Sequence, residues 1–217
     1  MKVFLIGAAG KIGRRLAPLL AAQGDEVSGM HRAPEQAQAL TDVGAVPVAG
    51  DLVADPVDEL AAKMAGHDAV VFSAGAGGAG AEMISAIDGQ GLRKAAAAAA
   101  AAGARRFVLV SVFPESRRGG QISEGFEHYL SVKKAADAHL AATDLHWLIV
   151  RPGGLLDERG SGRVSAGPAL EQADVPRDDV AGFIATALAE PALDRRVVEL
   201  TAGTEPIADA ARRLART

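Results

Sequence analysis

The sequence predicts an α/β protein in which a doubly wound parallel sheet lies between two layers of helices, α/β/α, with a small C-terminal extension. The main observation is an alternation of short apolar runs with longer segments of helical composition, as in parallel strands buried on both faces and the helices connecting them. A second observation is the glycine content, 25 of 217 residues, well above the usual level of roughly 7%. These glycines fall mainly at the ends of the predicted elements, which is the third observation.

Six apolar runs are the predicted strands of the sheet, and five segments between them are the predicted helices. The strands are Val3–Ile6, Val27–Met30, Ala45–Val48, Ala69–Phe72, Phe107–Val110 and Trp147–Val150. The helices are Lys11–Gln23, Pro34–Val43, Pro56–Ala65, Ala81–Ala102 and about Glu127–Thr143. Four of the helices are followed by Gly24, Gly44, Gly66 and Gly103, where a left-handed residue is favoured. Pro34 and Pro56 suit the first turn of their helices.

The C-terminal part predicts a small extension of the same sheet. It contains a strand near Arg163–Ser165, a helix near Asp178–Ala189, a strand at Val197–Thr201 and a last helix from Ile207. Neither a linker nor an internal repeat is visible, so residues 1–217 are expected to form one domain.

Composition excludes several classes of function. The net charge of −4 argues against a nucleic-acid or anionic-membrane partner. The absence of cysteine excludes disulfides, thiolate metal sites and a cysteine nucleophile, and the five histidines lack paired ligand spacing, so no metal is expected. The first apolar stretch is too short for a signal peptide. We therefore expect a cytoplasmic monomer or homodimer that acts on a small molecule.

The first predicted strand ends in a glycine-rich turn, Gly7-Ala8-Ala9-Gly10-Lys11-Ile12-Gly13. In such a turn Gly7 allows the sharp bend, Gly10 lets the backbone approach a pyrophosphate, and Gly13 lets the helix meet the strand closely. The helix N-terminus then offers free N–H groups and a positive dipole to the phosphates. This pattern favours a dinucleotide cofactor over the alternative that the glycines serve only a tight turn.

The end of the second strand bears on which dinucleotide binds. A carboxylate there would hold the adenosine ribose, whereas an arginine would meet a 2′-phosphate. The strand leads into His31 and Arg32 without an acid. Arg32, helped by Arg14, therefore favours NADP over NAD. The alternative is that Arg32 is a solvated charge and Glu35 reaches the ribose.

Two further loops follow strands at the same predicted edge. Asp51 and Leu52 come after the third strand, where Asp51 is a candidate acceptor for the adenine amino group or, equally, a turn or cap residue. Ser73, Ala74 and Gly75 begin a glycine-dense loop after the fourth strand. Such a loop lets the backbone lie against a cofactor or serves as a mobile flap.

Tyr129 and Lys133 form the sharpest chemical signal. They are four residues apart on a predicted helix, so both side chains project from one face. A nearby cation is expected to lower the pKa of a phenol and make it a usable proton donor or acceptor. Tyr129 is the only tyrosine of the chain. Ser111, after the fifth strand, is a candidate for holding a substrate oxygen or simply ends the strand.

In this order, Gly7/Gly10/Gly13, Asp51-Leu52, Ser111, Tyr129/Lys133 and Arg151-Pro152-Gly153 resemble the short-chain dehydrogenase/reductase superfamily. The stretch from His128 to Asp137, Leu148–Gly153 and Arg177–Ala181 are similar to its small, atypical NAD(P)-binding branch, whose members are often labelled sugar epimerases. The resemblance covers essentially the whole chain. It implies a Rossmann-type sheet with the C-terminal extension on the substrate side, and a cofactor in the glycine rim.

The resemblance also implies roles for individual residues. Lys133 would bond the nicotinamide ribose, and Pro152 and Gly153 would border the nicotinamide. The expected cofactor residues are Gly7, Ala9, Gly10, Lys11, Ile12, Gly13, Arg32, Asp51, Leu52, Ser73, Ala74, Gly75, Lys133, Pro152 and Gly153. The expected catalytic residues are Tyr129, Lys133 and Ser111.

The chain departs from this family in three respects. It contains no asparagine, so the asparagine of the family's catalytic tetrad is missing. The family's catalytic serine or threonine falls at Ser111 or one place on, at Val112. The region after Arg151 is short for a sugar epimerase.

The leading hypothesis is an NADP-preferring oxidoreductase acting on a small carbonyl, quinone or flavin-like acceptor. The alternatives are an NADP(H)-sensing regulator with little turnover and a sugar-nucleotide epimerase.

Overall fold

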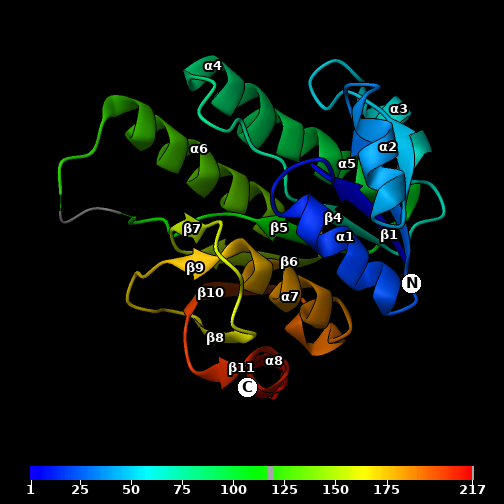
Figure 1. Ribbon diagram of the computed structural model, residues 1–217. Helices are drawn as coiled ribbons and strands as arrows, with labels where there is room; N and C mark the ends of the chain where they lie inside the picture. Colours follow the sequence, from blue (N-terminus) through cyan, green and yellow to red (C-terminus); the bar gives the residue numbers. More distant parts are fainter. Residues whose placement is uncertain (117–119, 217) are drawn as a thin grey trace.

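A computed structural model describes residues 1–116 and 120–216, and it has the expected three layers (Figure 1). Within these residues one nine-stranded sheet has the order β11-β8-β10-β6-β5-β4-β1-β2-β3. The six predicted strands are confirmed and parallel: β1 (Lys2–Ile6), β2 (Glu26–His31), β3 (Ala45–Ala49), β4 (Ala69–Phe72), β5 (Arg106–Val110) and β6 (His146–Pro152). The fold is therefore a Rossmann-like α/β fold, as predicted.

The C-terminal extension continues the sheet beyond β6. Strand β10 (Arg196–Ala202) pairs with β6 in parallel, and β8 (Arg163–Gly167) pairs with β10 in antiparallel orientation. The short strand β11 (Glu205–Pro206) closes this edge beside β8. A separate two-stranded pair, β7 (Leu155–Leu156) and β9 (Val175–Pro176), was not expected from the sequence.

Helices cover both faces of the sheet and define two apolar cores. One layer contains α1 (Gly13–Ala22), α2 (Gln36–Asp42), α7 (Arg177–Leu188) and α8 (Ile207–Ala215). The other contains α3 (Val57–Met64), α4 (Ala81–Met83), the π-helical segment η1 (Ile84–Gly91), α5 (Leu92–Ala102) and α6 (Glu124–Ala141). A 3₁₀ turn, η2 (Pro191–Leu193), follows α7. Alternate side chains of β1 enter the two cores: Val3 and Leu5 face one, Phe4 and Ile6 the other.

Local glycine and proline signals account for most element boundaries. Gly24, Gly44, Gly66 and Gly103 all have φ between 77° and 86°, which confirms the predicted left-handed residues after four helices. Pro56 directly precedes α3. In contrast, α2 begins at Gln36, two residues after Pro34, so this proline lies in the turn before the helix rather than in its first turn.

The strand order places a crevice at one edge of the sheet. The chain runs from β1 through β2 to β3, then returns to the other side of β1 to form β4. The helices that connect the strands on the two sides of β1 cover opposite faces of the sheet. A crevice therefore opens at the carboxyl ends of β1 and β4. In the part of the chain that the structure describes, each helix is too short or too polar to cross a membrane.

Candidate functional site

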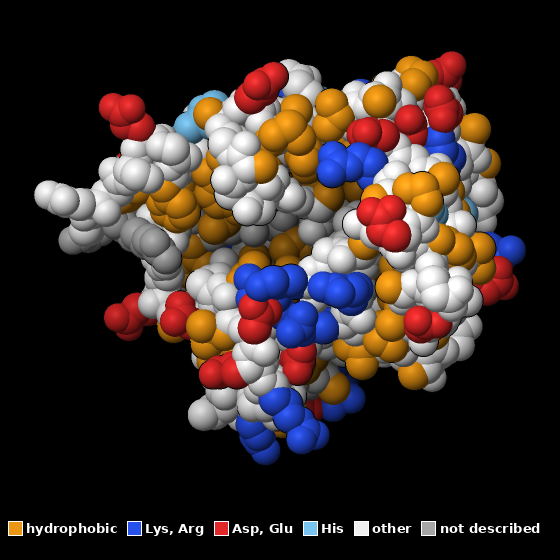
Figure 2. Space-filling view, turned by 45° about the horizontal axis from the view of Figure 1, so that its top comes forward, with side chains coloured by type: hydrophobic (Ala, Val, Ile, Leu, Met, Phe, Trp, Pro, Cys, Tyr) orange, Lys and Arg blue, Asp and Glu red, His pale blue; other side chains and the backbone are white. Residues whose placement is uncertain are grey.

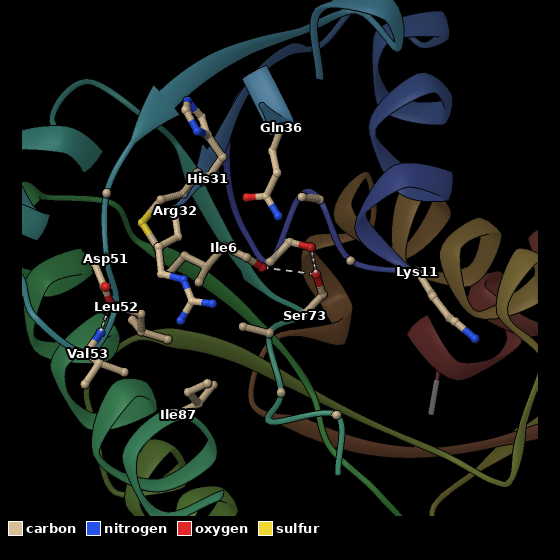
Figure 3. Close-up of a pocket in the computed structure, with 18 residues that line it drawn as sticks. Ile6, Lys11, His31, Arg32, Gln36, Asp51, Leu52, Val53, Ser73 and Ile87 are labelled. Carbon is tan, nitrogen blue, oxygen red and sulfur yellow. Dashed lines mark hydrogen bonds between the residues drawn. The ribbon is translucent and has the colours of Figure 1, made fainter. Parts of the chain in front are cut away.

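A cleft of about 480 Å³ opens at the carboxyl ends of β1, β2, β3 and β4 (Figure 3). The expected cofactor residues that line it are Gly7, Ala9, Gly10, Lys11, Arg32, Asp51, Leu52, Ser73, Ala74 and Gly75. The structure therefore brings together segments from the ends of four strands. Its volume lies within the range of small-molecule and cofactor sites.

In the glycine turn at the base of the cleft, the first and last glycines, Gly7 and Gly13, have no space for a side chain. Gly7 has a φ of 82°, and a Cβ atom there would lie 2.5 Å from the backbone nitrogen of Ala74. At Gly13 a Cβ atom would lie 2.3 Å from the carbonyl oxygen of Gly7. Because α1 begins at Gly13, its N-terminus follows directly on the turn, and the buried Ile12 lies behind the lining residues. Such a bare backbone beside a helix N-terminus fits a pyrophosphate.

Arg32 and Gln36 extend into the cleft from the end of β2 and the start of α2 (Figure 3). Arg32 is exposed, and within the described residues its guanidinium has no hydrogen bond or ion pair. The backbone N–H of Ala33 donates to Oε1 of Gln36 at 3.2 Å, which orients that side chain. No sequence motif pointed to Gln36 as a residue of the cleft. Glu35, the alternative ribose partner, is not among the lining residues.

Asp51 and Ser73 have structural partners at the rim. Oδ1 of Asp51 accepts hydrogen bonds from the backbone N–H groups of Val53 at 2.8 Å and Ala54 at 3.3 Å, so the turn role is present. The hydroxyl of Ser73 donates to the carbonyl oxygen of Ile6 at 3.0 Å, which ties the end of β4 to β1 (Figure 3). Contact of Asp51 with the adenine stays a prediction.

A second cleft, of about 470 Å³, shares Gly75 and Gly77 with the first. The glycine loop after β4, the segment α4–η1 and the start of α6 line it, including Ile84, Phe126 and Tyr129. The rings of Phe126 and Tyr129 lie 5.8 Å apart. Figure 2 shows the hollow in this part of the surface, with hydrophobic side chains on one side and a group of Lys and Arg side chains below it. The second cleft therefore adjoins the first at the glycine loop.

Tyr129 and Lys133 lie on α6 as predicted, and Lys133 is almost completely buried. Its Nζ donates to the carbonyl oxygen of Val110, at the end of β5, at 2.9 Å. The same Nζ lies 3.5 Å from Oδ1 of Asp88 on η1. Lys133 is therefore fixed between a strand end and a buried carboxylate.

The pKa of Tyr129 moves in the direction opposite to our prediction. Burial raises it well above its ordinary value, and the negative charges of Asp88 and Asp137 raise it further. The prediction counted the cation at Lys133 and missed two nearby carboxylates that the fold supplies. The expected lowering is wrong, because desolvation and these acids dominate. Tyr129 therefore holds its proton at neutral pH.

Ser111 is directed at a carboxylate. Its hydroxyl donates to Oδ1 of Asp137 at 2.6 Å, and Oδ2 of Asp137 accepts from Nε of Arg151 at 2.9 Å. Burial raises the pKa of Asp137, while the hydrogen bond from Ser111 and the charge of Arg151 oppose that rise. Ser111 is therefore placed to support the buried network of Asp137 and Arg151. Its contact with a substrate stays a prediction.

Pro152 and Gly153 lie outside the residues that line the two clefts. Pro152 is the last residue of β6. A Cβ atom at Gly153 would lie 1.7 Å from the carbonyl oxygen of Ala173, so a glycine is required there by packing. The proposed contact of both residues with the nicotinamide is not tested by this arrangement.

Lys11 connects the glycine turn to the C-terminal half. Its backbone lines the first cleft, while its side chain points away and donates to Oδ2 of Asp157 at 2.6 Å. Nη1 of Arg177 also donates to Asp157, at 2.9 Å. The hydrogen bond from Lys11, followed by the charges of Arg177 and Lys11, keeps the pKa of Asp157 below its ordinary value. Residues 155–157 are thereby held against α1 and α7.

Comparisons with known proteins agree with the fold and the cleft. Residues 7–191 match a family model described as NAD(P)H-binding. The uncharacterized sugar epimerase YhfK of Bacillus subtilis (strain 168) is 41% identical over 99% of this chain and 100% of its own length. Two solved structures are also similar. A Bacillus halodurans protein assigned as an NAD-dependent epimerase/dehydratase has a TM-score of 0.90 at 33% identity, covering 98% of this chain and 99% of that chain.

The second solved structure is the oxidoreductase ylbE of Lactococcus lactis, with a TM-score of 0.87 at 26% identity, covering 100% of this chain and 98% of that chain. The matched region contains the glycine turn, both clefts and the Tyr129–Lys133 pair. The NAD(P)-binding family expected from the sequence is confirmed: this chain belongs to the NAD(P)H-binding family, and the relatives described above are named an epimerase, an epimerase/dehydratase and an oxidoreductase.

Proposed function

We propose that the protein is an NAD(P)-dependent oxidoreductase that prefers NADPH and reduces a small carbonyl, quinone or flavin-like acceptor. The observation that carries this proposal is the junction of the two clefts at Gly75 and Gly77, with a protonated, half-buried Tyr129 in the lining of the second cleft. A bound dinucleotide would supply a hydride at this junction. The name of the similar Lactococcus lactis protein, an oxidoreductase, agrees with this class of reaction.

The chain's own residues supply the proton. The hydroxyl of Tyr129 would donate its proton to the acceptor oxygen on which negative charge develops during reduction. Lys133, four residues further along α6, would supply positive charge near the tyrosinate that is left. The raised pKa keeps the donor protonated before the reaction, which favours reduction over oxidation.

The preference for NADPH rests on Arg32. Its exposed guanidinium extends into the cleft and is not paired within the described part of the chain, so a 2′-phosphate would not have to displace another partner. A charge-assisted hydrogen bond to phosphate contributes about 1.5–3 kcal/mol. We expect Arg32→Ala to weaken NADPH binding by about 10- to 100-fold and to leave NADH binding nearly unchanged.

Fluorescence titrations with NADPH and NADH test this preference, followed by a turnover screen in the same cuvette. Arg14, expected from the sequence to help Arg32, is exposed on α1 outside the residues that line the cleft. Arg14→Ala is therefore the matched control, and it should change both affinities equally and little. If Arg32→Ala kept the original preference for NADPH, the assignment of Arg32 to the 2′-phosphate would be wrong.

A second candidate function is a sensor of NADP(H) with little or no turnover. It is favoured by the hydrogen bond from Ser111 to Asp137, which turns this hydroxyl away from a substrate role, and by the lack of asparagine. A sensor would bind NADPH tightly, and its affinity for a protein partner would change with the nucleotide. Sustained multiple-turnover oxidation of NADPH with any acceptor would favour the enzyme.

A further inference from the structure

Asp88 is a buried acid that lines the same cleft as the proposed proton donor, Tyr129, and no sequence motif contains it. It lies on η1 and is only 2% exposed. Its Oδ2 accepts the backbone N–H of Ala76 at 3.0 Å, and its Oδ1 lies 3.5 Å from Nζ of Lys133. One carboxylate therefore contacts both the glycine loop between the two clefts and the cation of the Tyr129–Lys133 pair.

The local helix geometry brings Asp88 to this position. Glycines at 89 and 91 let η1 pack closely: a Cβ atom at Gly89 would lie 3.2 Å from Cγ1 of Val132, and one at Gly91 would lie 2.8 Å from Cδ2 of Leu52. The segment thus fits between α6 and the loop after β3. π-Helical turns are frequent at functional sites because they shift one side chain out of the regular helical pattern.

The glycine loop is shaped around the same carboxylate. A Cβ atom at Gly75 would lie 3.3 Å from Oδ1 of Asp88. Any side chain at this position would therefore require a small displacement of the acid. Gly75 lines both clefts. Contact between Ala76 and Asp88 hence fixes the loop at the point where the two clefts meet.

We propose that Asp88 is a positioning residue that couples the glycine loop of the cofactor cleft to Lys133 and sets the charge environment of Tyr129. This inference rests on the proposed function for its effect on turnover, but not for its effects on cofactor affinity and on the tyrosine. The charged groups that act on Tyr129 are Asp88 from η1 and Asp137 from α6, and Lys133 from α6 lies against Asp88. Removing the negative charge at Asp88 lowers the pKa of Tyr129, since that charge is one cause of its rise.

The single tyrosine makes this measurable without a substrate. The near-ultraviolet absorption of a phenol ring depends on the charge around it, so a difference spectrum between variant and unsubstituted protein at neutral pH reports Tyr129. In Asp88→Asn, which keeps an oxygen for Ala76 but loses the charge, we expect the Tyr129 absorption band to shift at neutral pH. NADPH affinity should stay close to its original value.

Asp88→Ala removes the acceptor as well as the charge. We expect it to show the same tyrosine shift and, in addition, to weaken NADPH binding about tenfold, because the hydrogen bond from Ala76 that holds the loop is lost. Asp179→Asn is the matched control. Asp179 is also 2% exposed, but it lies on α7 in the other helical layer, so this variant should change neither readout. Thermal unfolding of each variant at the same neutral pH shows that the protein is folded.

Turnover gives the last readout. Asp88→Asn should lower the rate of reduction at a fixed neutral pH, because Lys133 loses the charged partner beside it. An unchanged near-ultraviolet spectrum in folded Asp88→Asn, or unchanged NADPH affinity in folded Asp88→Ala, overturns the coupling. If no acceptor were reduced by any form while both the binding change and the spectral change appeared, the proposed reaction would fail and the role of Asp88 would stand.

Discussion

Replacing Ser111 by alanine tests the buried network at the end of β5. Ser111 is 6% exposed, and its hydroxyl donates to Oδ1 of Asp137 at 2.6 Å. Asp137 keeps one further partner, Nε of Arg151. A hydrogen bond to a buried charged group contributes about 1.5–3 kcal/mol to stability. We therefore expect Ser111→Ala to lower the free energy of unfolding by about this amount at neutral pH.

The loss of stability in Ser111→Ala should depend on pH, and the hydrogen-bond network determines the direction of that dependence. Burial holds the pKa of Asp137 above its ordinary value, and the hydrogen bond from Ser111 holds it lower than burial alone would. An acid with a raised folded-state pKa contributes stability while protonated, below its unfolded-state pKa of about 3.9, and loses that contribution as the pH rises through the folded-state value. Ser111→Ala raises the folded pKa further. Its cost is thus smallest at acidic pH and grows as Asp137 ionises.

Thermal unfolding from about pH 4 to pH 8 measures this dependence, at about 2–4 °C per kcal/mol for a chain of this size. Ser116→Ala is the control, because Ser116 is also 6% exposed but its hydroxyl accepts from the neutral amide of Gln172 at 2.8 Å. Its cost should be independent of pH. A constant cost for Ser111→Ala across this range, equal to that of the control, would refute the assignment of a charged partner.

Two further predictions concern the glycine turn and the proton donor. Gly13→Ala places a Cβ atom 2.3 Å from the backbone oxygen of Gly7, so we expect a loss of about 1–3 kcal/mol in denaturant unfolding and loss of NADPH binding. Gly125→Ala, which meets open space on α6, should leave stability unchanged or raise it, and an equal loss in both variants would contradict the steric argument. Tyr129→Phe should lower turnover by about 10²- to 10⁴-fold at unchanged NADPH affinity, and full turnover would exclude Tyr129 as proton donor.

The elements that could be predicted from the sequence are those with local causes. The central strands β4 and β5 are continuous apolar runs because both faces are buried, and Gly24, Gly44, Gly66 and Gly103 follow helices whose last carbonyl groups need a left-handed residue. The glycine turn was predictable for the same reason, since its residues are neighbours in the chain. The start of α1 was not: residues 11 and 12 belong to the turn that surrounds Gly10, so the helix begins at Gly13.

The parts of the site that escaped prediction depend on distant partners. The side chain of Ser111 meets an acid 26 residues further along the chain, and Lys133 meets Asp88 from a segment 45 residues earlier. Neither spacing is a motif, because only the fold brings these positions together. The π-helical turn that places Asp88 lies in a run of small residues whose composition indicates an ordinary helix.

The error in the predicted tyrosine pKa shows what controls the chemistry of this site. Spacing along α6 places one cation beside Tyr129, whereas the fold adds Asp88 and Asp137, which pair with Lys133 and Arg151. Burial favours the neutral phenol and both carboxylates act in the same direction, so the cation that spacing places nearby does not decide the sign. On the proposed function, a phenol that keeps its proton until negative charge develops on an acceptor oxygen suits proton donation rather than proton removal.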